Sequence, residues 1–77
     1  MNIIQMDYVY LMVDDEEWED MTIYLSEEEA IQASIKYPNF RIEIFSKNDL
    51  FNGYRPTYNY YKKGILHTFV KKIYKIK

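Results

Sequence analysis

The chain has 77 residues, no cysteine and a formal net charge of −2, so neither a disulfide framework nor a thiolate metal site can stabilise it. A chain of this length has room for one hydrophobic core, and we expect a single small α+β domain over residues 1–77, with 71–77 as a basic arm. It contains no run of about 18 apolar residues and no basic-then-apolar N-terminus, so we expect an intracellular protein without a membrane partner.

Two segments near the N-terminus alternate their side chains with the period of two that is typical of β-strands. In residues 6–13 the two faces carry Val9, Leu11 and Val13, and Tyr8, Tyr10 and Met12. In residues 18–25 the face that we expect to be buried carries Met21, Ile23 and Leu25. The acidic run between the two segments is too short for a parallel crossover, so we expect an antiparallel hairpin.

The best-marked element is a helix over residues 27–37. Ser26 and Glu29 match a capping box, in which the Ser26 hydroxyl accepts from the Glu29 amide and the Glu29 carboxylate accepts from the Ser26 amide. An apolar stripe at helical spacing follows, made of Ala30, Ile31, Ser34 and Ile35. Pro38 disfavours helical geometry at Tyr37 and therefore predicts the end of the helix.

The second half of the chain predicts three more strands. Residues 40–46 return to the period of two, with Phe40, Ile42 and Ile44 expected to point inward. The segment 47–57 contains turn signals at Asn52-Gly53 and at Pro56, a residue that cannot donate to a strand ladder. We therefore expect a loop there, or an edge strand that starts late. Strands over 58–61 and 65–70 should be joined by a turn at Lys62-Lys63-Gly64.

These elements predict the fold class. We expect an α+β fold with a small antiparallel sheet, in the order β-β-α-β-β-β, and one helix packed on one face of that sheet. The residues that should form the core between helix and sheet are Leu11, Ile23, Leu25, Ile31, Ile35, Ile42 and Ile44.

Acidic and basic residues are almost completely segregated along the chain. Residues 1–39 hold ten acids and one base, a formal net charge of −9, whereas residues 40–77 hold two acids and nine bases, a net charge of +7. Such asymmetry permits three outcomes: the halves neutralise each other within one molecule, they pair between molecules, or one face binds an oppositely charged partner. We expect such contacts to weaken as the salt concentration rises.

No group of residues carries a catalytic or metal-binding motif. The acidic run 14–20 lacks the glycine and the spacing of a calcium loop, and we interpret it as a solvated turn or a docking surface for a basic partner. His67 is the only histidine and alternates with Ile65 and Phe69, as a residue on a strand face does. We therefore expect no enzymatic activity, no cofactor, no metal ion and no small-molecule substrate.

Two groups of residues are candidates for partner contacts. An arginine among exposed aromatic residues has the composition of an interface hot spot, and the candidate protein contacts are Phe51, Tyr54, Arg55, Tyr58 and Trp18. Lysines beside tyrosines can bind phosphates while the rings stack on bases, and the candidate basic contacts are Lys62, Lys63, Lys71, Lys72 and Lys75. Lysines also protect an edge strand from pairing with other strands, and this structural role is an alternative interpretation of the same lysines.

Four runs between Glu17 and Leu66 carry a resemblance to other proteins. They are Glu-Trp-Glu-Asp at 17–20, LSEEEAI at 25–31, Lys-Tyr-Pro-Asn at 36–39 and PTYNYYKKGIL at 56–66. In these runs the chain resembles small uncharacterised proteins of large DNA viruses. The resemblance implies a virion or host-interaction protein, located in the virion or in the host cytoplasm, and it supplies no site.

The sequence therefore predicts a non-enzymatic module for protein–protein interaction or assembly, in a viral structural or accessory role. Its partner is expected to be another protein or a second copy of the chain, as a homo-oligomer. Two alternatives remain. One is a nucleic-acid-binding accessory protein that uses the basic half, and the other is a small inhibitor of a host protein that acts through the acidic hairpin.

Overall fold

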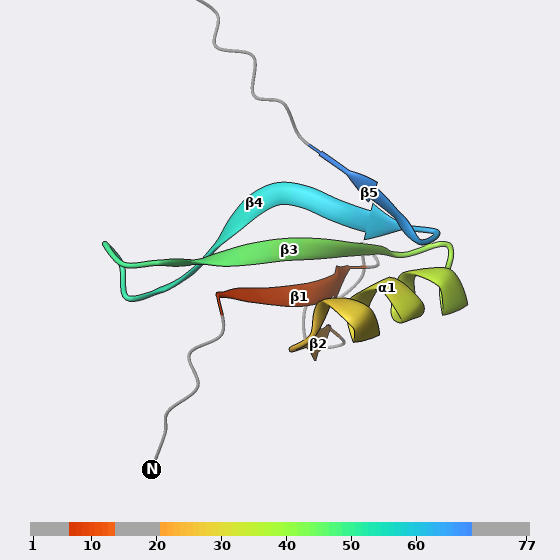
Figure 1. The fold of residues 1–77 in the computed structure, drawn as a ribbon, viewed down its shortest axis with the longest axis horizontal. Helices are drawn as coiled ribbons and strands as arrows, with labels where there is room; N and C mark the ends of the chain where they lie inside the picture. The colour runs from red at the N-terminus through yellow and green to blue at the C-terminus, as the bar shows by residue number, and fades with distance from the viewer. Residues whose placement is uncertain (1–6, 14–20, 69–77) are drawn as a thin grey trace, which may run out of the picture.

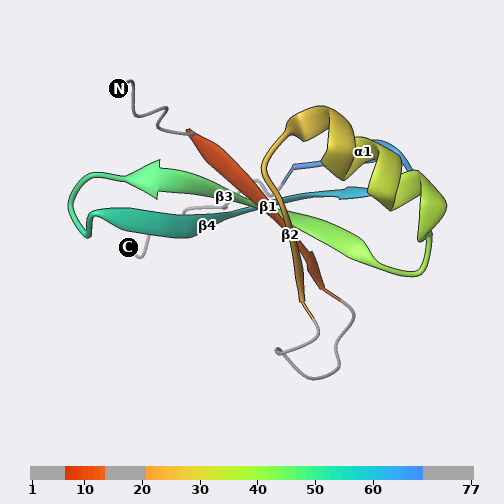
Figure 2. The ribbon, with the colours of Figure 1, turned by 90° about the horizontal axis from the view of Figure 1, so that it is seen from below.

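The computed structural model describes residues 7–13 and 21–68, which form one helix and five strands. In chain order these elements are β1 (Tyr8–Val13), β2 (Thr22–Tyr24), α1 (Glu27–Lys36), β3 (Arg41–Asn48), β4 (Gly53–Lys62) and β5 (Ile65–His67). The strands form one antiparallel sheet in the order β2-β1-β3-β4-β5. Figures 1 and 2 show α1 lying along one side of this sheet. The predicted α+β fold is confirmed.

The helix begins and ends where its sequence signals predict. Ser26 is the N-cap, and its hydroxyl oxygen accepts from the Glu29 amide at 3.1 Å. The Glu29 carboxylate accepts from the Ser26 hydroxyl at 3.0 Å, so it binds the side chain of Ser26 rather than the expected amide. The helix ends at Lys36, with Tyr37 as its C-cap directly before Pro38, because a residue before proline is driven out of helical geometry.

The core lies between small residues on the helix and large residues on the sheet. Ala30, Ala33 and Ser34 are the buried residues of α1, and their short side chains let the helix backbone approach the strands. The sheet supplies the larger buried side chains, which are Tyr10, Ile42, Ile44 and Tyr61. Met12, Tyr24 and Ile31 pack against this cluster and are partly buried.

The core predicted from the sequence is right for Ile42 and Ile44 and partly right for Ile31. It is wrong for Leu11, Ile23, Leu25 and Ile35. The register shows why two of these fail, since Tyr10 lies opposite Ile44 and Tyr24, whereas Leu11 lies opposite Glu43 and Ile23. Successive side chains of a strand point to opposite faces, so Tyr10 faces the helix and Leu11 faces away. Ile23, Leu25 and Ile35 are all more than half exposed.

A β3–β4 hairpin occupies most of the segment 47–57, so the predicted loop is wrong. β3 continues to Asn48 and β4 begins at Gly53, and the Asn48 side chain accepts from the Phe51 amide at 3.2 Å within the turn. Pro56 lies inside β4, opposite Phe45. β5 pairs with β4 only from Tyr60 to Lys62, so one side of β4 has no neighbouring strand at Pro56. Proline has no amide hydrogen to donate, and it is tolerated at such an unpaired edge.

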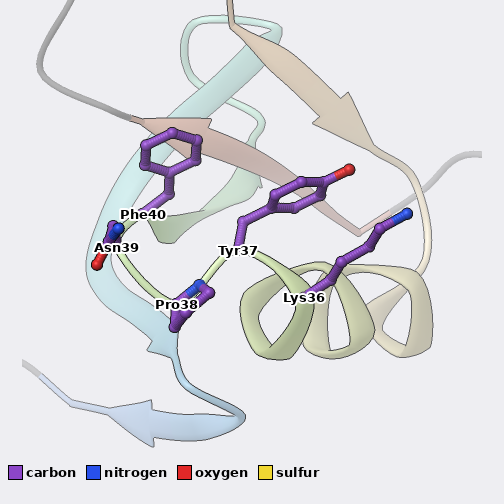
Figure 3. Close-up of a pocket in the computed structure, with 5 residues that line it drawn as sticks. All are labelled: Lys36, Tyr37, Pro38, Asn39 and Phe40. Carbon is purple, nitrogen blue, oxygen red and sulfur yellow. The ribbon is translucent and has the colours of Figure 1, made fainter.

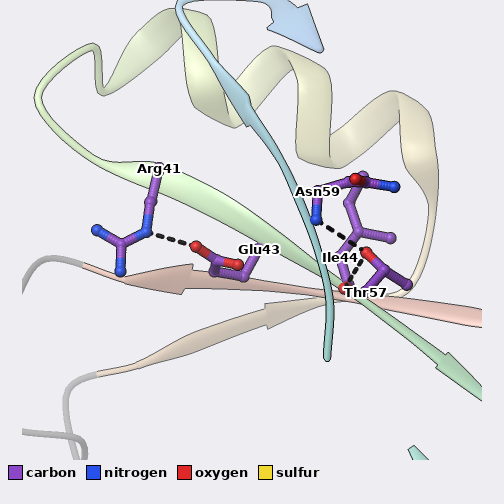
Figure 4. A network of polar contacts seen from close by, with 5 residues as sticks. All are labelled: Arg41, Glu43, Ile44, Thr57 and Asn59. Carbon is purple, nitrogen blue, oxygen red and sulfur yellow. Dashed lines mark hydrogen bonds and ion pairs between the residues drawn. The ribbon is translucent and has the colours of Figure 1, made fainter. Parts of the chain in front are cut away.

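The β3–β4 ladder contains an irregularity at Ile44. Glu43 lies opposite Tyr60 and Phe45 lies opposite Pro56, so Ile44 alone faces the three residues 57–59. The Thr57 hydroxyl donates to the Ile44 carbonyl at 2.8 Å and accepts from the Asn59 amide at 3.1 Å, as Figure 4 shows. Tyr58, between them, has a φ of 68°. A bulge of this kind re-aims side chains, and here it turns Thr57 and Asn59 toward the same hollow.

Candidate functional site

The hollow beside the start of α1 gathers polar side chains from every layer of the fold. We call it the tyrosine recess; its volume is ≈ 350 Å³, and its lining residues are Tyr8, Tyr10, Glu27, Ile44, Ser46, Thr57, Asn59, Tyr61 and Leu66. Ligand-binding hollows in proteins have volumes of roughly 300–1,000 Å³ and combine apolar walls with a few convergent polar groups. The tyrosine recess has both properties.

Glu27 and Tyr61 are fixed to each other at the wall of the recess. The Tyr61 hydroxyl donates to Oε2 of Glu27 at 2.8 Å, which joins β4 to the first residue of the helix. The Tyr61 ring lies 6.5 Å from the Tyr10 ring, centroid to centroid, with the two planes inclined at 44°. Both rings are more than nine-tenths buried. The carboxylate is therefore held beside two immobilised aromatic walls.

Burial and the Glu27 carboxylate raise the pKa values of two tyrosine hydroxyls in the recess. Burial raises the pKa of Tyr61 to about 12, and the hydrogen bond to Glu27 and its charge act in the same direction. Burial also raises the pKa of Tyr10, with smaller contributions from Glu27 and Tyr8. Negative charge is therefore disfavoured inside the tyrosine recess.

The raised pKa of Tyr61 predicts how stability depends on pH. The ordinary pKa of tyrosine is 10.0 and that of Tyr61 in the folded protein is about 12, so the folded state keeps a proton that the unfolded state loses. This contribution to the free energy of unfolding is complete below pH 10 and disappears as the pH rises through 12. We expect the urea midpoint of Tyr61→Phe to fall less steeply between pH 10 and pH 12 than that of the parent. Equal slopes for Tyr61→Phe and the parent would contradict the assignment.

The side of the sheet away from α1 is apolar and has no cover among residues 7–13 and 21–68. We call this surface the open face, and its apolar members are Val9, Leu11, Val13, Ile23, Phe45, Tyr60 and Ile65. Ile23 and Ile65 are each 61% exposed, and the remaining members are half-buried. The same two-residue alternation that buries Tyr10 and Ile44 under the helix places these side chains on the opposite surface.

The open face also carries charged residues, of which Arg41 and Glu43 lie on the central strand, with Glu43 between Leu11 and Tyr60. Arg41 forms an ion pair with Glu43 on the same strand, which Figure 4 shows. The Lys47 ammonium group lies 5.6 Å from the centre of the Tyr54 ring, to which Lys47 is also paired in the ladder. Lys62 pairs with Ile65 of the edge strand β5. The described charges of this face thus sum to a small positive value.

The structure brings together two of the predicted protein contacts at the end of the β3–β4 hairpin. The Arg55 guanidinium group lies 4.7 Å from the centre of the Phe51 ring. Tyr54 precedes Arg55 in β4 but pairs with Lys47, so its side chain lies on the opposite face of the sheet. Phe51 is 62% exposed and Leu50, beside it, is 83% exposed. The sequence reasoning omitted Leu50. Tyr58 lies apart from this group, at the bulge.

The predicted basic contacts are only partly covered by the structure. Lys62 ends β4 and is half-buried, whereas Lys63 is exposed in the turn before β5. Trp18, Lys71, Lys72 and Lys75 lie outside the described residues, as does the whole of the acidic run 14–20. His67 stacks on Tyr60, with ring centroids 4.8 Å apart and planes inclined at 8°, in keeping with the prediction of a strand-face histidine.

Two other hollows border the helix, and their lining residues are less suited to binding a ligand. One, of ≈ 230 Å³, follows the end of α1 and is lined by the consecutive residues 36–40 (Figure 3), so it is formed by a single turn. The other, of ≈ 410 Å³, is lined by two glutamates and a lysine, together with Tyr24, Gln32, Ala33 and Tyr37. The first hollow has no residue from a strand, and the second has charges of both signs and one strand residue, Tyr24.

The described part of the chain contains no cluster of three or more histidine, cysteine or carboxylate side chains that could bind a metal ion. None of the helical residues in 7–13 and 21–68 forms a segment long and apolar enough to span a membrane.

Sequence reasoning missed the tyrosine recess. Its residues are far apart in the chain; Tyr61, for example, is 34 positions from Glu27. The one available signal was the period of two that places Tyr8 and Tyr10 on the same face of β1. Comparisons of the chain with protein-family models, with curated proteins and with solved structures found no match.

Proposed function

We propose that the protein is a non-enzymatic assembly module whose open face packs against the open face of a second copy. The observation that carries this proposal is that the sheet has two apolar sides, of which α1 covers one. A sheet with an apolar face must bury that face against another element. In a second copy the same residues provide a surface of matching character, as a two-fold symmetric contact requires. An assembly role also suits the viral setting that the resemblance implies.

The dimensions of the open face are sufficient for a weak dimer. With strands about 4.8 Å apart and a rise of about 3.3 Å per residue, one face of these five strands covers roughly 500 Å². Stable interfaces bury about 800 Å² of accessible surface on each partner, and side chains that project from a sheet add accessible area to the flat value. We therefore expect a dimer that forms in a concentration-dependent way. It would have two packed sheets about 10 Å apart and the helices outside.

Salt distinguishes this contact from one between acidic and basic regions. On the central strand of the open face Arg41 and Glu43 neutralise each other as an ion pair. Lys47 and Lys62 leave the face with a net positive charge, so symmetric pairing brings like net charges toward each other. Added salt screens that repulsion and should leave the dimer intact or strengthen it. A contact made by oppositely charged surfaces would instead weaken with salt.

The test is sedimentation velocity of the full chain over a concentration series, in 0.15 M and 1 M salt. We expect a monomer–dimer equilibrium that persists at high salt and that Ile23→Glu abolishes, because the variant places a charge at an exposed apolar residue of the open face, opposite Leu11. Leu50→Glu is the matched control: it introduces the same charge at an even more exposed apolar residue, at the hairpin end, and should dimerise like the parent. Thermal unfolding verifies that both variants fold.

Three results would overturn the proposal. A monomer at every concentration would exclude self-assembly through the open face. Loss of the dimer in Leu50→Glu but not in Ile23→Glu would move the contact to the hairpin end with Phe51 and Arg55. Dissociation of the dimer in 1 M salt would favour a contact between charged surfaces.

A further inference from the structure

The described residues that line the tyrosine recess carry charge of one sign. Of its nine lining residues among 7–13 and 21–68 only Glu27 is formally charged, and none of these nine is a lysine or an arginine. The Glu27 carboxylate uses Oε2 to accept from Tyr61, but a carboxylate has two oxygens and about four acceptor positions. It can therefore accept further hydrogen bonds from a ligand without breaking the bond to Tyr61.

The walls of the recess also favour positive charge. The faces of aromatic rings carry partial negative charge and attract ammonium and guanidinium groups within about 6 Å of the ring centre. Tyr10 and Tyr61 provide two rings at fixed positions, 6.5 Å apart and mutually inclined. Tyr8 contributes a third and is about half exposed, so it lies where a ligand enters from solvent.

The end of the helix does not reverse this preference. A helix N-terminus carries about half a positive charge, but Glu27, Glu28 and Glu29 occupy the first turn of α1. The Ser26 side chain also accepts from the Glu29 amide. The pKa values of Tyr10 and Tyr61 are raised partly by Glu27, and the negative potential that opposes ionisation of these hydroxyls attracts a cation to the same place.

We propose that the tyrosine recess binds a cationic nitrogen group on an aliphatic stem, an alkylammonium or a guanidinium, with Glu27 accepting its hydrogen bonds and the rings of Tyr8, Tyr10 and Tyr61 surrounding it. Asn59 and Ser46 line the same space and provide further polar groups for the ligand. Two sources have this chemistry: a lysine or arginine side chain of a protein, and a free polyamine. The recess lies on the helix side of the sheet, so this proposal does not depend on the proposed dimer.

The experiment is a titration of the full chain followed by amide chemical shifts. The first probe is N-acetyl-arginine amide, and its control is N-acetyl-citrulline amide, which has nearly the same shape without the charge. We expect shift changes at residues of the recess with the arginine probe, and binding at least tenfold weaker with the citrulline probe. A blocked pentapeptide with one central arginine and the polyamine spermidine form two further arms. Tighter binding of the peptide identifies a protein side chain as the ligand, and tighter binding of spermidine identifies a free amine.

Two pairs of variants separate binding from folding. Glu27→Gln keeps an acceptor for Tyr61 and removes the charge, and it should weaken arginine binding by roughly tenfold, the loss expected for a charged hydrogen-bond partner. Glu28→Gln removes the same charge from the same helical turn but outside the recess, and should change the affinity less than twofold. Tyr8→Ala should weaken binding while Tyr54→Ala, on the other side of the sheet, should not.

The proposal is overturned by equal binding of the arginine and citrulline probes, by equal effects of Glu27→Gln and Glu28→Gln, or by the absence of shift changes at millimolar probe. Because Glu27 and Tyr8 are exposed side chains, these variants are expected to unfold at the parent's temperature. If Glu27→Gln or Tyr8→Ala unfolds at a lower temperature than the parent, the other of these two variants provides the test.

Discussion

Replacing Ile42 with alanine is expected to lower the free energy of unfolding by about 2–5 kcal/mol, the range for truncating a fully buried aliphatic side chain. Ile42 has no exposed surface and lies on the central strand, between Met12 of β1 and Tyr61 of β4. The small residues of α1 lie above this row and cannot expand into the space that truncation leaves. A loss of this size is a large part of the total stability of so small a domain.

The matched control is Ile23→Ala, which removes the same atoms from a side chain that is 61% exposed. It should cost less than about 1 kcal/mol when measured by urea unfolding at a protein concentration at which the chain is monomeric. Similar losses for the two variants would place both isoleucines in one core and contradict the register between β1 and β2. A stable Ile42→Ala variant would contradict the position of the helix.

The sequence predicted the elements of the fold well because their signals are local. The serine cap and the proline after the helix lie within a few residues of the backbone that they control. The turn at Lys63-Gly64 is a second example, since both residues have positive φ, 54° and 78°, as a two-residue hairpin turn of the primed type requires. Local signals of this kind need no knowledge of the rest of the chain.

The face of each strand could not be predicted in the same way. In β1 both faces are apolar, and the sequence reasoning chose the aliphatic Leu11 over Tyr10 for the core. The outcome depends on the helix, whose buried residues are two alanines and a serine. Such small side chains need large partners to fill the layer between helix and sheet, and tyrosines meet that need. This complementarity between elements distant in the chain becomes visible only in the folded structure.

The β3–β4 hairpin and the tyrosine recess also could not be predicted from local sequence patterns. Pro56 indicated a break in strand pairing, but a proline is compatible with a strand wherever one side lacks a neighbour, and the length of β5 decides that. The recess depends on the bulge at residues 57–59 and on the meeting of Glu27 with Tyr61, neither of which a local pattern contains. Its chemistry follows from topology rather than from a motif.

Replacing Gly64 with alanine should lower the free energy of unfolding by about 2–5 kcal/mol through two separable effects. The first is conformational, because an L-residue with a side chain at a φ of 78° costs about 1–2 kcal/mol. The second is steric, because a Cβ atom at this position would lie 2.9 Å from Cγ1 of Ile35 and 3.2 Å from its Cδ1. Displacing a β-branched helical side chain from its preferred rotamer costs roughly 1–3 kcal/mol.

A double-mutant cycle with Ile35→Ala separates the two effects. Ile35→Ala alone should cost little, because the side chain is 53% exposed, which replaces the sequence-based expectation that Ile35 is a core residue. In the Ile35→Ala background the clash is absent, so Gly64→Ala should cost only the conformational part, about 1–2 kcal/mol. Equal costs in both backgrounds, measured by urea unfolding, would show that the turn does not contact the helix at Ile35. That contact stands beside the hydrogen bond from the Gly64 amide to the buried Ser34 hydroxyl, at 3.0 Å, and together they attach the β4–β5 turn to the helix and so hold β4 against the base of the tyrosine recess.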